Sequence, residues 1–170
     1  MLPHLTEADL RDQRDWSIAT FGPYPRPAGL VKHLRKELVE IEKAPDDLTE
    51  YIDVMILAFD GALRCTHGTP ARVLHAFEGA AAAMPFVVDL WMSLLTSVDW
   101  VPDAPDDVAQ WTLVAAVAYE IALDMADLPD VGSAGETVVA EYRNKMVENR
   151  RRTWPDWREV GPNEAVEHIR

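Results

Sequence analysis

Apolar residues recur at intervals of three and four along nearly the whole chain, as they do on the buried face of an α-helix. The clearest stripe contains Leu30, Leu34, Leu38 and Ile41. No segment keeps the alternation of apolar and polar residues that is typical of a half-buried strand. The sequence therefore predicts an all-α fold, with helices at about 7–20, 28–43, 46–66, 70–83, 86–98, 106–127 and 134–153.

Local signals set the expected ends of these helices. Thr6 is followed by acidic residues and reads as the N-cap of the first helix. The segment Phe21–Pro27 has three prolines in five residues and cannot be helical, and a second Pro-rich loop follows at Val101–Pro105. Pro45 ends one helix, and the next begins at Asp46 or Asp47, which predicts an antiparallel helical hairpin.

Two pairs of carboxylates flank the turn of this hairpin. They are Glu37-x-x-Glu40 and Glu50-x-x-Asp53. Residues three apart share a helix face, so the two pairs are expected to lie level across the hairpin. Three residues of helix rise are roughly 4.5 Å, which is close to the ~3.5–4 Å between the ions of two-metal sites.

The second helix of the hairpin is apolar around most of its circumference. Asp53 and Asp60 bracket an unbroken apolar run, so this helix is expected to lie inside a bundle. A buried carboxylate needs a shifted pKa, a basic partner or a bound cation. Lys36, Lys43 and Arg64 are the nearby basic residues, too few for five acids, and oxygen-only ligands favour Mg²⁺ or Mn²⁺. The alternative is a solvated acidic face.

Composition fits one globular domain over residues 1–170. The chain is 48% hydrophobic and 26% charged, with a net charge of −13. This acidity argues against a protein that coats nucleic acid, because phosphate backbones are bound by clustered Lys and Arg. The single Cys65 excludes an intrachain disulfide and fits a reducing compartment.

The sequence also predicts a cytoplasmic protein that binds no membrane. The first residues lack a basic segment followed by an apolar one, so we expect no secretory signal. Pro85, Asp89 and Glu120 interrupt the longest apolar stretches, which are too short and too charged to span a bilayer.

The last predicted helix carries a cationic face. Lys145, Asn149 and Arg152 are spaced i, i+4, i+7 and share one side of the helix. Such a set of donors suits phosphate oxygens. Arg150 and Arg151 are interpreted instead as complements to the negative end of the helix.

Together these residues resemble a known family. The motifs are Glu37-x-x-Glu40 within Gly29–Ile41, Glu50-x-x-Asp53 within Glu50–Ala62, and Lys145-x3-Asn149-x2-Arg152-x-Trp154-Pro155. They are similar to those of the MazG-like all-α nucleoside triphosphate pyrophosphohydrolases. Within that family they resemble the dATP/dGTP diphosphohydrolase group, which includes the phage MazZ enzymes of 2-aminoadenine DNA synthesis. The resemblance covers about 14–76 and 137–157.

The resemblance implies an oligomeric helical bundle, with a central metal-binding hairpin, that hydrolyses a nucleoside triphosphate to the monophosphate and pyrophosphate. By position, Glu37, Glu40, Glu50 and Asp53 are the expected ligands of two or more Mg²⁺ or Mn²⁺ ions, and Lys145, Asn149 and Arg152 the expected phosphate ligands. We expect Glu37 or Glu40 to accept the proton of the attacking water. Two departures stand out: Lys36 replaces the family's usual acid, and about 77–136 is an extra helical segment without a counterpart in shorter members.

The substrate-binding residues Lys36, His33 and Asp60 complete the expected site, each with an alternative. Lys36 contacts phosphate or lies in solvent. His33 orients a ligand or meets a phosphate, or is a capped, partly buried histidine. Asp60 binds a lysine, the metal shell or a sugar hydroxyl. Trp16, Phe21, Trp154 and Trp157 stack on a base or, more often for such positions, belong to the core.

We expect dGTP and GTP as preferred substrates and a homodimer or homotetramer as the assembly. Three alternatives remain open: a house-cleaning pyrophosphohydrolase of other base preference, a non-catalytic nucleotide-binding bundle, and a di-iron carboxylate bundle. The last is disfavoured because neither acidic pair is Glu-x-x-His.

Overall fold

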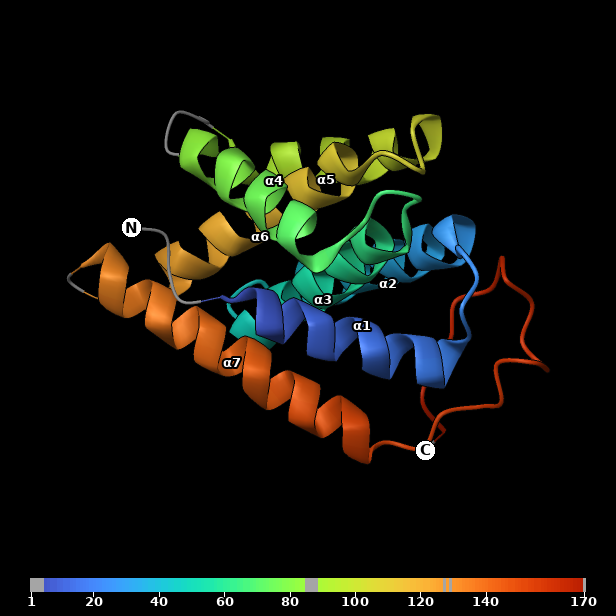
Figure 1. Cartoon of the computed structure of the whole chain (residues 1–170). Helices are drawn as coiled ribbons and strands as arrows, with labels where there is room; N and C mark the ends of the chain where they lie inside the picture. The colour runs from blue at the N-terminus through green and yellow to red at the C-terminus, as the bar shows by residue number, and fades with distance from the viewer. Residues whose placement is uncertain (1–4, 85–88, 127, 129, 170) are drawn as a thin grey trace.

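The computed structural model describes residues 5–84, 89–126, 128 and 130–169. Over these residues the chain is all-helical, which confirms the predicted fold class and is consistent with a MazG-like bundle (Figure 1). The α-helices are α1 (Glu7–Phe21), α2 (Pro27–Lys43), α3 (Leu48–Arg64), α4 (Pro70–Ala83), α5 (Leu90–Trp100), α6 (Val108–Met125) and α7 (Val131–Arg151).

Side-chain caps explain where most of these helices begin. Thr6 forms a capping box with Asp9 at the start of α1, as the sequence predicts. Asp47 caps α3, so this helix starts at Leu48 rather than at residue 46. Asp130 caps α7, which therefore begins three residues before its predicted start.

The predicted middle helices are shifted at their ends. The helix expected at 86–98 is α5, which follows its N-cap Asp89, and residues 86–88 lie outside the described residues. The predicted loop Val101–Pro105 begins with one turn of 3-10 helix, Val101–Asp103. The predicted end of α6 at residue 127 also lies outside the described residues.

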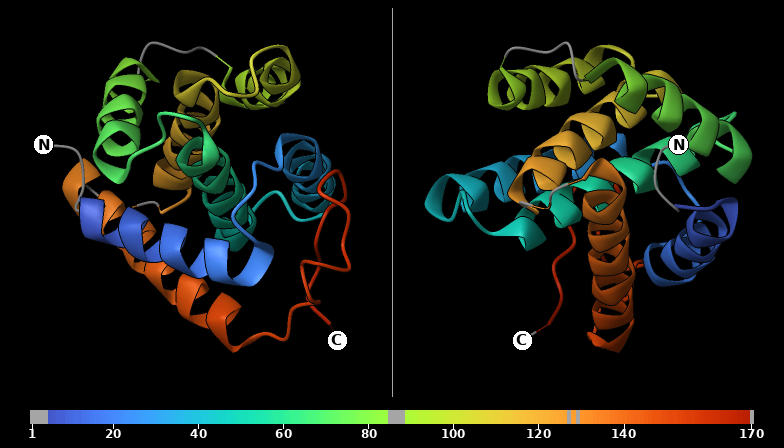
Figure 2. Two further views of the ribbon diagram at one scale, coloured as in Figure 1. Left: turned by 45° about the vertical axis from the view of Figure 1, so that its right-hand side comes forward. Right: turned by 90° about the vertical axis from the view of Figure 1, so that its left-hand side faces the viewer.

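Helix α3 is the centre of the bundle. It packs most extensively on α6 and also contacts α1, α2, α4 and α7 (Figure 2). Its apolar run is buried as predicted, with Val54, Ala58 and Phe59 fully inaccessible. Gly61 permits the close approach of α6, because a Cβ atom there would lie 2.2 Å from the Trp111 ring.

Helix α6 is long and apolar enough to cross a membrane by length and composition alone. Its mean hydropathy is 1.2, and 61% of it is buried inside the bundle. The core helix of a soluble protein meets the same criterion, so the observation is weak evidence for a membrane span.

The chain after α7 returns across the start of α2. The Ile169 amide donates to the Thr153 carbonyl over 2.8 Å, so the end of this C-terminal segment pairs with its beginning. Gly29 of α2 leaves room for it, since a Cβ atom there would lie 2.5 Å from the Glu164 carbonyl oxygen. The segment brings its last residues beside the acidic hairpin.

Candidate active site

The α2–α3 hairpin forms as predicted and brings three acidic residues together. One carboxylate oxygen from each of Glu37, Glu50 and Asp53 lies within 4.8 Å of the other two. All three residues are half-buried. The Tyr51 hydroxyl donates to the Pro45 carbonyl over 3.2 Å and so ties the turn to α3. A group of carboxylate oxygens of this size can hold a divalent cation.

The fourth predicted ligand, Glu40, stands apart from this cluster. Its carboxylate accepts a hydrogen bond from Lys43 over 2.8 Å, and its side chain is 53% exposed. Lys43 lies three residues further along the same helix face, so it competes with a metal ion for the Glu40 carboxylate. The level arrangement of two pairs is therefore only partly formed, and the metal role of Glu40 stays a prediction.

Asp53 has a basic partner from a distant part of the chain. The Lys145 ammonium on α7 lies 2.8 Å from its carboxylate, and both side chains are largely buried. Lys145 was not among the nearby basic residues identified from the sequence, because it lies far along the chain on α7. Burial raises the pKa of Asp53 to about 6, although Lys145 acts in the opposite direction.

The cluster still carries more negative than positive charge. The pKa of Glu50 is raised by burial and then by repulsion from Glu37 and Asp53. Burial acts to lower the pKa of Lys145, but its hydrogen bond and attraction to Asp53, together with attraction to Glu148, outweigh burial, so that this pKa is raised. One ammonium faces three carboxylates, and a bound cation would relieve the remaining repulsion.

The predicted cationic face of α7 lines the same cavity as the acids. Lys145, Asn149 and Arg152 all border it. Asn149 is buried, and its side-chain oxygen accepts from Arg152 Nη1 over 2.9 Å. Arg152 also pairs with Glu148. Cations and acids thus face each other across one space, as substrate phosphates and metal ions would require.

Two predicted residues from α2 have partners at the rim. His33 Nε2 lies 3.0 Å from Glu37 Oε1, a contact that orients this carboxylate toward the cluster. His33 is also partly buried, so its role as an orienting residue stays a prediction beside the alternative of a capped histidine. Lys36 is exposed and pairs with Glu167 of the C-terminal segment.

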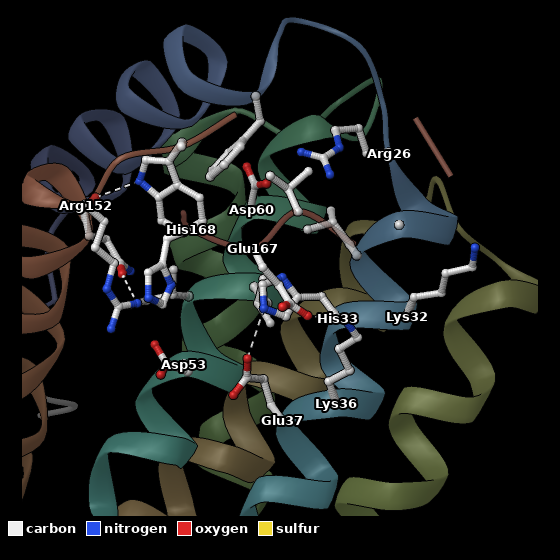
Figure 3. Close-up of a pocket in the computed structure, with 18 of the residues that line it drawn as sticks. Arg26, Lys32, His33, Lys36, Glu37, Asp53, Asp60, Arg152, Glu167 and His168 are labelled. Atoms are coloured by element: carbon white, nitrogen blue, oxygen red, sulfur yellow. Dashed lines mark hydrogen bonds and ion pairs between the residues drawn. The ribbon is translucent and has the colours of Figure 1, made fainter. Parts of the chain in front are cut away.

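The cavity has a volume of about 770 Å³, which is in the range of small-molecule sites. Figure 3 shows its two ends: Glu37 and Asp53 lie at one, and Asp60 and Arg26 at the other. Asp60 is buried and binds Arg64 Nε over 2.9 Å rather than a lysine.

Aromatic side chains line the end near Asp60. Phe21 and Trp154 have ring centroids 4.9 Å apart, and Trp16 lies edge-on to both. Each of the three is half-buried and borders the cavity. Trp157, the fourth predicted aromatic, packs instead on Tyr24 and against Gly22.

Comparison with known proteins adds one finding. Residues 10–76 match the dATP/dGTP pyrophosphohydrolase family. The match runs from α1 to the middle of α4 and includes the acidic hairpin with its Glu37, Glu50 and Asp53 cluster. No curated protein and no solved structure matches the chain.

The match indicates a pyrophosphohydrolase enzyme, and it supports the resemblance to the MazG-like nucleoside triphosphate pyrophosphohydrolases. It implies a nucleoside triphosphate substrate and hydrolysis that depends on a divalent metal, and the acidic cluster supplies a fitting set of ligands. Lys145, Asn149 and Arg152 lie outside the matched residues, and only the structure places them at the hairpin.

Sequence reasoning missed several polar residues that border the cavity, among them one arginine and two residues near the C-terminus. Arg26 lies in the proline-rich connection before α2, while Glu167 and His168 belong to the C-terminal segment. None of them lies in a helical repeat or a spaced motif. Of these residues, only Arg26 could have been suspected from the sequence, because it is a basic residue in the loop directly before the acidic hairpin.

Proposed function

We propose that this enzyme hydrolyses a purine nucleoside triphosphate, with dGTP and GTP preferred, to the monophosphate and pyrophosphate. The observation that carries the proposal is the carboxylate cluster of the matched hairpin, which lines one cavity of nucleotide size together with Lys145 and Arg152. The product dGMP would feed the synthesis of 2-aminoadenine nucleotides.

Glu37, Glu50 and Asp53 would hold the metal, with Glu40 as a further ligand. The donor set is all oxygen, which suits Mg²⁺ or Mn²⁺, and we propose two or more ions. When bound, these ions would neutralise and polarise the phosphate oxygens of the substrate. The raised pKa of Glu50 supports the proposal, because crowding of negative charge causes it in part.

The remaining roles follow from donors and acceptors at the cluster. An ammonium has three donors, so Lys145 can keep its contact with Asp53 while it donates to a phosphate oxygen. Arg152, which also lines the cavity, would bind the leaving pyrophosphate. Glu37, held by His33, or the exposed Glu40 would accept the proton of the water that attacks the α-phosphorus.

The protein would act in the cytoplasm as a homodimer or homotetramer, on a free nucleotide rather than on nucleic acid or at a membrane. The net charge of −13 supports a free nucleotide over nucleic acid as the substrate, because an acidic protein repels long polyanions.

The test is release of pyrophosphate from each of the eight common (deoxy)nucleoside triphosphates, with Mg²⁺ and with excess chelator. We expect dGTP and GTP to give the highest kcat/KM and the chelator to abolish turnover. If a pyrimidine triphosphate is best, the purine assignment is wrong. If nucleotides bind but none is hydrolysed, the hydrolase proposal itself fails.

A further inference from the structure

Asp60 is a buried carboxylate in the cavity that the proposed hydrolysis does not use. Its residue surface is 5% exposed, and it borders the cavity. It follows Asp53 by seven residues on α3, a rise of about 10 Å along the helix. Figure 3 shows it at the end of the cavity away from Glu37. If phosphates occupy the acidic end, Asp60 lies where the base of the nucleotide would reach.

One oxygen of Asp60 is fully occupied and the other is free. Oδ1 accepts from the Ser17 hydroxyl and from Arg64 Nε, the latter over 2.9 Å. Within the described part of the chain, Oδ2 has no hydrogen-bond donor. A buried acceptor without a partner is costly, whereas one at the wall of a cavity can be satisfied by a ligand.

Arg64 holds this carboxylate in place and has no donor left for a ligand. Its Nη1 donates to the carbonyls of Gly22 and Tyr24, over 2.8 and 2.7 Å. Its Nη2 donates to the carbonyl and hydroxyl of Ser17, over 3.1 and 2.6 Å. With Nε on Asp60, all five N–H groups of the guanidinium are used. Arg64 thus neutralises Asp60 and fixes its orientation, and Oδ2 remains the group available for recognition.

A second arginine supplies a donor at the same end. Arg26 is buried with 7% exposure, borders the cavity and lies near Asp60 (Figure 3). Its Nη2 donates to the Glu164 carbonyl over 3.2 Å, and its guanidinium lies over the Phe21 ring, 5.4 Å from the centroid. Arg26 and Asp60 thus place a donor and an acceptor at the same end of the cavity, where Arg26 lies against the Phe21 ring.

We propose that Asp60 and Arg26 recognise the guanine base, with Oδ2 of Asp60 accepting from N1–H and the N2 amino group and Arg26 donating to O6. The inference rests on the proposed function, because it assumes that the phosphates bind at the acidic end. Among the common bases, guanine alone presents an acceptor followed by two donors along this edge. In the same orientation adenine places its amino group against Arg26 and the unprotonated N1 against Asp60, so both contacts fail.

The half-buried aromatic residues supply the third part of this base site. A planar base gains affinity by stacking on aromatic faces without regard to its hydrogen-bonding edge. Stacking would therefore bind any base, and Asp60 with Arg26 would discriminate among them. A site that hydrogen-bonds a substrate group rejects analogues that lack it, because its own buried groups are then left unpaired.

Binding of substrate analogues tests the inference without relying on turnover. The ligands are the non-hydrolysable α,β-imido analogues of dGTP, dITP and dATP, titrated with Mg²⁺ by calorimetry. Hypoxanthine, the base of dITP, differs from guanine only in lacking the N2 amino group. We expect the dGTP analogue to bind about tenfold to hundredfold more tightly than the dITP analogue, the usual range for one hydrogen bond to a charged group, and more tightly still than the dATP analogue.

Asp60→Asn tests the same contact from the protein side. The amide oxygen must still accept from Arg64, so the new amino group replaces Oδ2 and turns an acceptor into a donor. We expect the preference for dGTP over dITP to disappear and the dATP analogue to gain relative to both. Arg26→Gln should weaken the dGTP and dITP analogues equally, because both bases carry O6.

The matched control is Asp9→Asn. Asp9 also pairs with an arginine of another helix, Arg143, over 2.9 Å, but it does not border the cavity. This variant should keep the wild-type ratios. Equal affinity of the wild-type protein for the dGTP and dITP analogues would overturn the inference, and this measurement does not depend on whether Asp60→Asn folds. Equal weakening of the binding of all three analogues by Asp60→Asn would overturn it as well.

The inference and the proposed function fail separately. Discrimination among the analogues without hydrolysis of dGTP would reject the hydrolase and leave the base site standing. Hydrolysis of dGTP without discrimination among the analogues would do the reverse.

Discussion

At the scale of single residues, the ion pair between Asp53 and Lys145 links the two halves of the site. It joins a predicted metal ligand to a predicted phosphate ligand over 2.8 Å, inside the protein. Breaking a buried pair by removing one partner leaves the other charge uncompensated. Experiments on variants of either residue must therefore measure folding and activity separately.

Asp53→Asn should abolish turnover while the helical content is kept. The amide has the size of the carboxylate and can still accept a hydrogen bond from Lys145, but it is a poor ligand for a divalent cation. Circular dichroism and pyrophosphate release measure the two effects. Wild-type protein should also gain thermal stability when Mn²⁺ is added, and the variant should gain less. Wild-type turnover in the variant would refute the role of Asp53.

Lys145→Ala and Arg152→Ala should weaken triphosphate binding more than monophosphate binding, because both residues are assigned to the leaving pyrophosphate. Loss of one hydrogen bond to a charged group corresponds to about a tenfold to hundredfold rise in Kd. Calorimetry with dGMP and a non-hydrolysable triphosphate analogue gives both values. Equal losses for the two ligands would assign these residues a structural role.

At the scale of elements, the hairpin and its caps could be predicted because their signals are local. The apolar stripe of α2, the break at Pro45 and the apolar run of α3 lie within about thirty residues, and they place Glu37 and Asp53 near each other. Helix ends were less predictable, since a cap such as Asp130 can add residues that the apolar repeat does not mark.

The rest of the site depends on contacts between distant segments. Lys145 reaches Asp53 only because α7 packs on α3, and Glu167 reaches the cavity only because the C-terminal segment returns over α2. No periodicity encodes these contacts. The resemblance of the Lys145 motif to a known family anticipated that Lys145 belongs to the site. Nothing in the sequence anticipated that Glu167 reaches the cavity.

The close packing of α3 on α6 gives a prediction at this scale. Gly61→Ala should destabilise the protein by about 1–3 kcal/mol, because the new methyl group would overlap the buried Trp111 ring. Gly79→Ala on α4 is the matched control. Apart from its chain neighbours and the backbone of its own helix, no atom of the described residues lies within 4 Å of its Cβ position, so the same change should stabilise by roughly 0.5–1 kcal/mol. Urea denaturation measures both, and a stable Gly61→Ala variant would contradict the packing.

At the scale of the whole molecule, the chain combines a strongly acidic surface with exposed apolar residues on α5. Met92 and Trp100 are each more than half exposed. Their exposure supports the expectation of a symmetric homo-oligomer, most simply a dimer or a dimer of dimers. Light scattering at micromolar concentration should give a multiple of the 19.1 kDa chain mass, and a monomer would contradict the expectation.

The central claim is that water attacks the α-phosphorus of a nucleoside triphosphate at the Glu37, Glu50 and Asp53 cluster. Hydrolysis of dGTP with Mg²⁺ in ¹⁸O-labelled water, followed by mass spectrometry of the products, tests it most directly. We expect dGMP and pyrophosphate as products, with one ¹⁸O atom in dGMP and none in pyrophosphate. Label in pyrophosphate, or release of dGDP and inorganic phosphate, would contradict it.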